Sequence, residues 1–259
     1  EYEERYACSS AAGGLKMISI GLVPELTAQA SKEASLGAGA KVWKTYSFNL
    51  TKGDMREIEK YHPDIILLTG GTDGGNAECI LYNAKMLADL SYDCPIVIAG
   101  NRCAAEECQE ILEGRTTYIC ENVMPRLGEL NIEPTQKQIR EIFLKRIVQG
   151  KGLSEASDLV SGIIMPTPSA MLAAMELLSD GWEDCRGIGE LVGVDLGGAT
   201  TDVYSIADGN PANAATVMKG LQEPYAKRSV EGDIGMRYSA QGILEAAGDR
   251  KLSKISGIN

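Results

Sequence analysis

The chain has 259 residues, 44% of them hydrophobic and 24% charged, with a formal net charge of -11. This length and apolar content suffice for two domains with buried cores. The acidic balance, with no cluster of Lys and Arg between aromatic residues, argues against a nucleic-acid partner. The longest apolar runs, such as Ile65–Leu68, are far shorter than the roughly 20 residues that cross a bilayer. The first residues are acidic, unlike a secretory signal. We therefore expect a cytoplasmic protein with no membrane partner.

The first large segment alternates short apolar runs with amphipathic stretches, a pattern typical of repeated βα units around a parallel sheet. It predicts strands at 16–22, 41–48, 64–69, 95–99 and 116–121. Helices are predicted at 24–36, 51–61, 76–90, 104–112 and 134–149. We therefore expect a doubly wound, Rossmann-like α/β domain over residues 15–150, with a boundary at Gly150-Lys-Gly152.

A glycine-rich run, Gly70–Asn76, follows the predicted strand 64–69. The carboxyl edge of a doubly wound sheet is where ligands usually bind, so the run is a candidate site for a ligand or a partner. A plain turn from strand to helix is the alternative, and it is the simpler interpretation of the sequence.

The seven cysteines are odd in number and show no CxxC spacing, and the chain has one histidine. Such a set is typical of reduced thiols, mostly in cores. Neither a zinc site nor a Ser-His or Cys-His nucleophile is favoured.

A further helix is predicted from Thr167, a plausible N-cap, with Pro168 at its first position. Its apolar face would hold Met171, Leu172, Met175 and Leu178. One short linker then leads to the run Val192–Val203.

That run, Val192-Gly-Val-Asp-Leu-Gly-Gly-Ala-Thr-Thr-Asp-Val203, carries the chemistry best suited to a triphosphate and its magnesium ion. Gly197 and Gly198 let backbone amides approach phosphate oxygens, and Thr200 and Thr201 add hydroxyl donors. Two carboxylates complete the set: Asp195 is the candidate magnesium ligand, and Asp202 would support the loop or orient an attacking water, so both are candidate catalytic residues. The alternative is a glycine hairpin turn with Asp and Thr as local caps.

The helix and this loop resemble the actin-like (ribonuclease H-like) ATPase superfamily, in which such a loop holds the β- and γ-phosphates. Four segments in order, 8–17, 64–76, 195–203 and 230–236, resemble the MutL-type proteins that accompany glutamate mutase in bacteria. The resemblance implies a chaperone-like ATPase, or reactivating factor, that acts on an adenosylcobalamin-dependent mutase and uses ATP/ADP with Mg²⁺. It also implies that residues 1–14 are a remnant of the ATPase core, that 15–150 is an inserted domain and that 151–259 is an actin-like segment.

Related ATPases return to the nucleotide near a glycine-acid segment after this loop. Glu231, Gly232 and Asp233 are the matching residues here, and the two acids are candidates to approach magnesium or ribose. A capped loop that opens a helix over 234–247 is the alternative.

Two expected parts of an actin-like ATPase are not found in the sequence: a first Asp-Gly phosphate loop near the N-terminus and an adenosine-binding glycine turn near the C-terminus. We therefore expect the chain to be a fragment. Two other functions stay open, a non-catalytic binding or assembly module and an ATP-dependent enzyme like the hydantoinases and oxoprolinases, which the loop also resembles.

Overall fold

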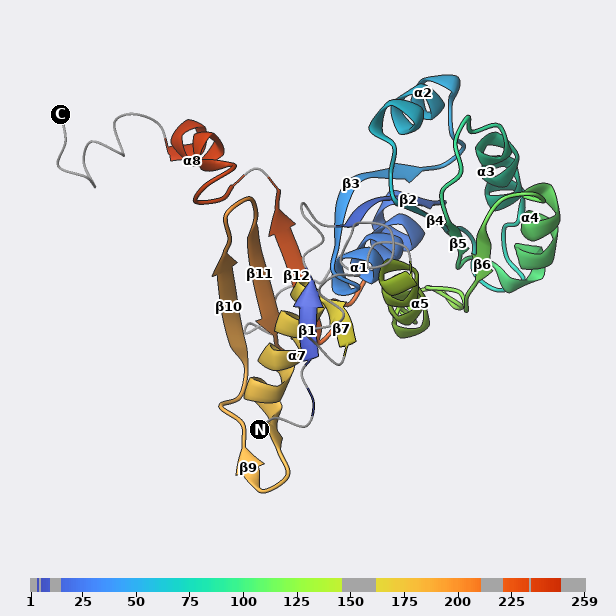
Figure 1. The fold of residues 1–259 in the computed structure, drawn as a ribbon. Coiled ribbons are helices and arrows are strands. Elements are labelled where there is room, and N and C mark those ends of the chain that lie inside the picture. The colour runs from blue at the N-terminus through green and yellow to red at the C-terminus, as the bar shows by residue number, and fades with distance from the viewer. Residues whose placement is uncertain are drawn as a thin grey trace. The chain divides into compact units, whose positions relative to one another are not determined.

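The computed structural model describes residues 4, 6–9, 15–145, 162–210, 221–232 and 234–247. The chain forms two compact units (Figure 1). The first unit comprises Glu1–Met171 with Asp208–Pro224, and the second comprises Leu172–Ala207 with Tyr225–Asn259. The division falls within helix α7 (Thr167–Asp180). The predicted boundary at Gly150–Gly152 lies outside the described residues.

The first unit contains a five-stranded sheet in the order β3-β2-β4-β5-β6, and every neighbouring pair is parallel. The strands are β2 (Leu15–Gly21), β3 (Ala40–Ser47), β4 (Ile65–Leu68), β5 (Ile96–Ile98) and β6 (Thr117–Ile119). Strand β3 lies on one side of β2, and β4, β5 and β6 follow in order on the other side. This arrangement is that of a doubly wound sheet. The predicted α/β fold with a parallel central sheet is therefore confirmed.

Helices cover both faces of this sheet (Figure 1). Because side chains alternate along a strand, Ile65 and Leu67 of β4 join one apolar layer while Ile66 and Leu68 join the other. The first layer includes α1 (Gln29–Gly37) and α5 (Glu133–Phe143). The second includes α2 (Lys52–Tyr61), α3 (Glu78–Ala88) and α4 (Ala105–Ile111).

Local signals in the sequence explain where several of these helices begin. Pro24 opens the short helix η1 (Pro24–Ala28), which continues into α1. Thr51 caps α2 through a reciprocal capping box with Asp54. A second short helix, η2 (Arg102–Ala104), precedes α4. The predicted helix 134–149 begins one residue earlier, and its α-helical part ends at Phe143.

The first unit also contains a parallel pair of strands, β1 (Tyr6–Ser9) and β7 (Gly162–Pro166). Strand β1 is the described part of the predicted N-terminal remnant, residues 1–14. Strand β7 leads directly into α7, whose first two residues are the predicted Thr167 and Pro168.

The second unit is built on an antiparallel sheet of β10 (Leu191–Leu196), β11 (Thr201–Ile206) and β12 (Ala226–Glu231). The connection from α7 to β10 is not the plain linker expected from the sequence. It contains a tight hairpin of β8 (Gly181–Trp182) and β9 (Cys185–Arg186). No described helix combines the length and the apolar character needed to span a membrane.

The alternative interpretation of the glycine-acid segment predicted a helix over 234–247. The helix found there is shorter. Helix α8 covers only Ala240–Ala247. The preceding residues do not continue the helix because the N–H groups of Met236, Arg237 and Tyr238 donate to carbonyls of Gly197 and Gly198. Their hydrogen bonds join the glycine loop instead of a helical turn.

Candidate functional site

The glycine loop, Gly197–Thr200, joins β10 to β11 in an antiparallel hairpin. The Gly197 N–H donates to the Thr200 carbonyl over 2.9 Å and closes the loop. Asp195 pairs directly with Asp202 across the two strands. Since opposite residues of an antiparallel pair share a face, the hairpin brings both predicted carboxylates to one face of the sheet.

A second segment, residues 234–238, is hydrogen-bonded to the glycine loop. The N–H of Met236 donates to the Gly197 carbonyl over 2.9 Å, and the Thr201 hydroxyl donates to the Ile234 carbonyl over 2.9 Å. Gly235 makes this approach possible, because a Cβ there would lie 2.5 Å from the carbonyl carbon of Ala199. The backbone after β12 therefore returns to the glycine loop through residues 234–238, which follow the predicted glycine-acid segment Glu231–Asp233.

The loop keeps a row of open donors. Among the described residues, the backbone N–H groups of Gly198, Ala199 and Thr200 have no acceptor in the protein. Successive free amides in a turn form a concave, partly positive surface that binds anions. A Cβ on Gly198 would lie 3.7 Å from Arg237 Cβ and 3.8 Å from Tyr238 Cδ2, so a methyl group would fit there in ordinary contact with both side chains. The hydroxyl protons of Thr200 and Thr201 are engaged within the protein, which leaves the amides as the open donors.

The two facing carboxylates have different environments. Asp195 is half-buried and has no ion-pair or hydrogen-bond partner among the described residues. Asp202 has a side chain that is 9% exposed, and it pairs with the still more deeply buried Arg228 of β12. The distances from Asp202 Oδ1 are 2.7 Å to Arg228 Nε and 2.5 Å to Nη2. Asp202 Oδ2 accepts the Thr200 hydroxyl over 3.2 Å.

Arg228 explains how two carboxylates can face each other across neighbouring strands. Like charges directly opposite in a sheet are destabilising, and a buried carboxylate requires a partner. The guanidinium group neutralises Asp202 and leaves Asp195 as the available negative charge. Sequence reasoning did not assign Arg228 a role, because the register that places it opposite Tyr204 is a long-range feature.

The remaining predicted residues lie at the base of the loop or outside the described chain. Glu231 is exposed at the end of β12 and pairs with Thr201. Gly232 follows it directly. Asp233 lies outside the described residues.

Helix α7 covers the carboxylate-bearing face of the sheet near Gly193. A Cβ at Gly193 would lie 2.7 Å from Met175 Cε, so the glycine lets the helix approach the strand. Leu172 is buried, in agreement with the predicted apolar face. Leu178 keeps the helical spacing of that face but is 49% exposed.

Tyr204 lies opposite Gly193, and its fully buried hydroxyl makes no hydrogen bond of good geometry, although Arg228 is close enough to interact with it. Burial and then the negative charge of Asp202 raise its pKa to about 12, although Arg228 acts in the opposite direction.

Replacing Tyr204 with Phe should therefore raise the free energy of unfolding of the second unit by about 1 kcal/mol at neutral pH, because it removes an unsatisfied buried polar group. A raised pKa also means that the folded state keeps a proton that the unfolded state loses. The wild type should lose stability between pH 10 and about pH 12, and this loss should be smaller in the variant. Urea unfolding at neutral and alkaline pH measures both effects, and equal slopes in the two proteins would contradict the assignment.

The other glycine-rich run, Gly70–Asn76, is held by side chains from neighbouring loops of the first unit. Asp73 Oδ1 accepts from the Arg102 N–H over 3.0 Å and from Asn122 Nδ2 over 2.9 Å. Asn101 Oδ1 accepts from the Gly74 N–H, and Asn101 Nδ2 donates to the Gly75 carbonyl. These groups are engaged within the protein, which favours the interpretation of a structural turn.

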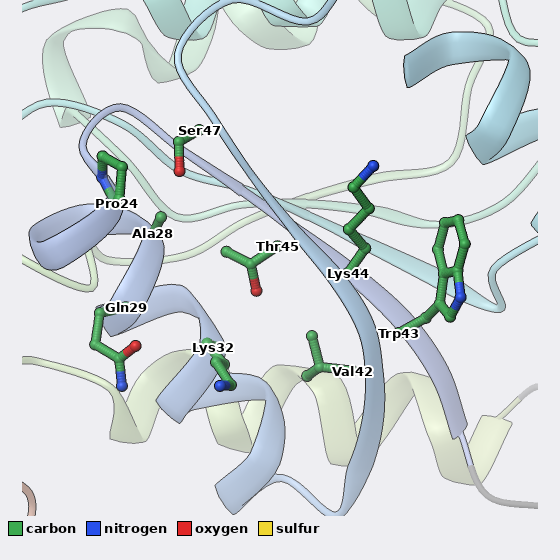
Figure 2. Close-up of a pocket in the computed structure, with 9 residues that line it drawn as sticks. All are labelled: Pro24, Ala28, Gln29, Lys32, Val42, Trp43, Lys44, Thr45 and Ser47. Carbon is green, nitrogen blue, oxygen red and sulfur yellow. The ribbon is translucent and has the colours of Figure 1, made fainter. Parts of the chain in front are cut away.

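A pocket of about 430 Å³ lies beside the edge strand β3 of the first unit (Figure 2). Thr45 and Ser47 face Gln29 and Lys32 of the neighbouring helix. Several polar groups are already engaged: Thr45 bonds to Ser19, Lys44 to Glu57 and Gln29 to Glu33. The pocket therefore offers fewer open donors than its composition suggests, and the glycine loop is the stronger candidate site.

Comparison with known proteins agrees with the motif order seen in the sequence. The family model described as "MutL protein" matches residues 1–257. A curated relative, "Protein MutL" of Clostridium tetanomorphum, is 54% identical over 255 residues. This match covers 98% of the chain and 55% of the relative, so the chain spans about half the length of the curated relative. No solved structure matches the chain. The chain belongs to the MutL protein family.

Proposed function

We propose that the second unit carries a phosphate-binding loop of an actin-like ATPase that acts as a reactivating factor for an adenosylcobalamin-dependent mutase, such as glutamate mutase. The observation that supports it most is the row of three open amides, Gly198 to Thr200, which begins three residues after Asp195, a carboxylate without a partner among the described residues. A plain hairpin turn requires neither feature. The partner mutase is inferred from the family resemblance.

The residues present fit magnesium and a phosphate group. Magnesium is usually bound through one or two carboxylates together with substrate phosphates and water, so Asp195 suffices as the protein's contribution. No cluster of three or more metal-binding side chains occurs within the described ranges. When bound, magnesium neutralises charge on the phosphate oxygens during transfer to water.

Each residue of the loop has a role that follows from its contacts. The amides of Gly198, Ala199 and Thr200 would bind phosphate oxygens, with Gly197 closing the turn. Asp195 would orient the water shell of the metal. Of the two roles expected for Asp202, support of the loop is favoured, since both of its oxygens are engaged by Arg228 and Thr200. Glu231 and Asp233 stay candidates for contacts with the metal or ribose.

A second candidate function is a non-catalytic assembly module. The observation that favours it is a row of exposed apolar side chains on β10, formed by Val192, Val194 and Leu196 with 69%, 63% and 46% exposure. Exposed apolar groups of this kind often contact other polypeptides. Such a module would not need the open amides of the glycine loop.

The substitution Gly198→Ala tests the proposal, because it adds a methyl group next to the Gly198 N–H, and this group would meet Arg237 and Tyr238 only at ordinary contact distance. We expect calorimetric titration of Mg-ATP to show an affinity at least tenfold lower, a loss of about 1.4 kcal/mol. Gly53→Ala in α2 is the matched control, with space for its methyl group and no contact with the loop.

The titration should be made with this chain and with the protein at its natural length. Binding that is insensitive to Gly198→Ala would remove the loop from the nucleotide site. Absence of binding by both lengths of the wild type would favour the assembly module.

A further inference from the structure

We propose that Arg228 is a positioning residue that holds the glycine loop in its anion-binding form. The positioning itself follows from contacts within the second unit, and its consequence for nucleotide affinity rests on the function proposed above. Arg228 is distant from the loop in sequence, and its guanidinium reaches the loop through Asp202.

The first step is the orientation of the Asp202 carboxylate. Two guanidinium nitrogens, Nε and Nη2, converge on the same oxygen, Oδ1. Oδ2 is therefore left for the Thr200 hydroxyl, which donates to it over 3.2 Å. A carboxylate rotated out of this orientation would lose one of these bonds, so Arg228 fixes the direction in which the free carboxylate oxygen faces the Thr200 hydroxyl.

The second step links Thr200 to the rest of the loop. Its carbonyl accepts the Gly197 N–H, and the Gly197 carbonyl accepts the Met236 N–H, both over 2.9 Å. Met236 belongs to the segment that follows β12, the strand that carries Arg228. The bonds form a closed ring from Arg228 through Asp202, Thr200, Gly197 and Met236, and the backbone from Met236 to Arg228 completes it.

Arginine suits this position better than lysine. The guanidinium is planar and presents several N–H groups in fixed directions, whereas the lysine ammonium is a compact and strongly hydrated charge. With a side chain that is 3% exposed, Arg228 has little access to water. A lysine there would keep the charge and lose the second N–H bond to Oδ1.

The test separates positioning from simple stability. In the double variant Arg228→Met/Asp202→Leu, apolar side chains of similar volume replace the buried ion pair. Such a replacement usually preserves folding. We expect hydrogen exchange to become at least tenfold faster at the amides of Gly197, Met236, Arg237 and Tyr238, which hold the loop closed. Amides of β10 and β11 should change much less. A purely structural role would accelerate exchange across the whole sheet by a similar factor.

Nucleotide binding gives a second readout. Mg-ATP affinity should fall at least tenfold in the double variant and by a smaller factor in Arg228→Lys. The matched control is Lys44→Met/Glu57→Gln, which removes a half-exposed ion pair of the first unit and should leave both readouts unchanged.

The outcomes are distinguishable. Exchange that accelerates selectively at the four amides that hold the loop closed supports the positioning role even if the wild type binds no Mg-ATP. Absence of binding would refute only the proposed function. Exchange that is unchanged, or uniformly faster in all strands of the second unit, overturns the positioning role.

Discussion

Replacing Asp195 with Asn in the protein at its natural length should reduce magnesium-dependent ATP hydrolysis by at least ~100-fold, the size of effect seen when one preorganised electrostatic group is removed from an active site. The reason is that Asp195 is the available carboxylate beside the open amides, since Arg228 neutralises Asp202. Steady-state phosphate release with and without magnesium measures the effect.

The same substitution should not weaken the fold. Asp195 has no partner to lose among the described residues and faces the carboxylate of Asp202, so removing its charge should leave stability unchanged or slightly higher. Asp184→Asn, in the exposed turn between β8 and β9, is the matched control for loss of one negative charge. The prediction fails if Asp195→Asn still hydrolyses ATP with magnesium while the wild type without magnesium does not. The metal would then be held by another residue.

Much of the first unit could be predicted from the sequence because its signals are local. Buried strands such as Ile65–Leu68 are continuous apolar runs, as expected in a parallel sheet covered on both faces. The capping box at Thr51 and Pro24 at the start of η1 identify helix starts within a few residues. These features depend on neighbours in sequence and need no knowledge of the fold.

The second unit was less predictable because long-range contacts override local patterns there. The sequence of residues 234–239 is compatible with the start of a helix, yet the N–H groups of Met236, Arg237 and Tyr238 bond to the glycine loop, and α8 begins only at Ala240. Leu178 has helical spacing with Leu172 and Met175 but is half-exposed. The limits of the three predicted domains stay predictions.

In the candidate site too, local features could be predicted from the sequence and long-range contacts could not. The spacing of Asp195, the two glycines and Asp202 identified the hairpin and its loop from sequence alone. It did not distinguish the roles of the two aspartates, because the distinction comes from Arg228, which the register of β12 brings to Asp202. Charge alone could have suggested a partner for one aspartate, but not which cation.

The second large effect concerns this pair. Arg228→Met alone should lower the free energy of unfolding of the second unit by about 3–5 kcal/mol, because it leaves the Asp202 carboxylate buried without its counter-charge. Asp202→Leu alone should have a comparable effect by leaving the guanidinium unpaired. Urea unfolding followed by a probe in the second unit measures both.

The double variant Arg228→Met/Asp202→Leu should recover most of that loss, since replacing a buried ion pair by well-packed apolar side chains is often neutral or stabilising. Such recovery would mean that the pair contributes little net stability and that its value lies in orienting Thr200 and the glycine loop. Losses that simply add in the double variant would show that the two side chains do not interact in solution, and the environment assigned to Asp202 would then be wrong.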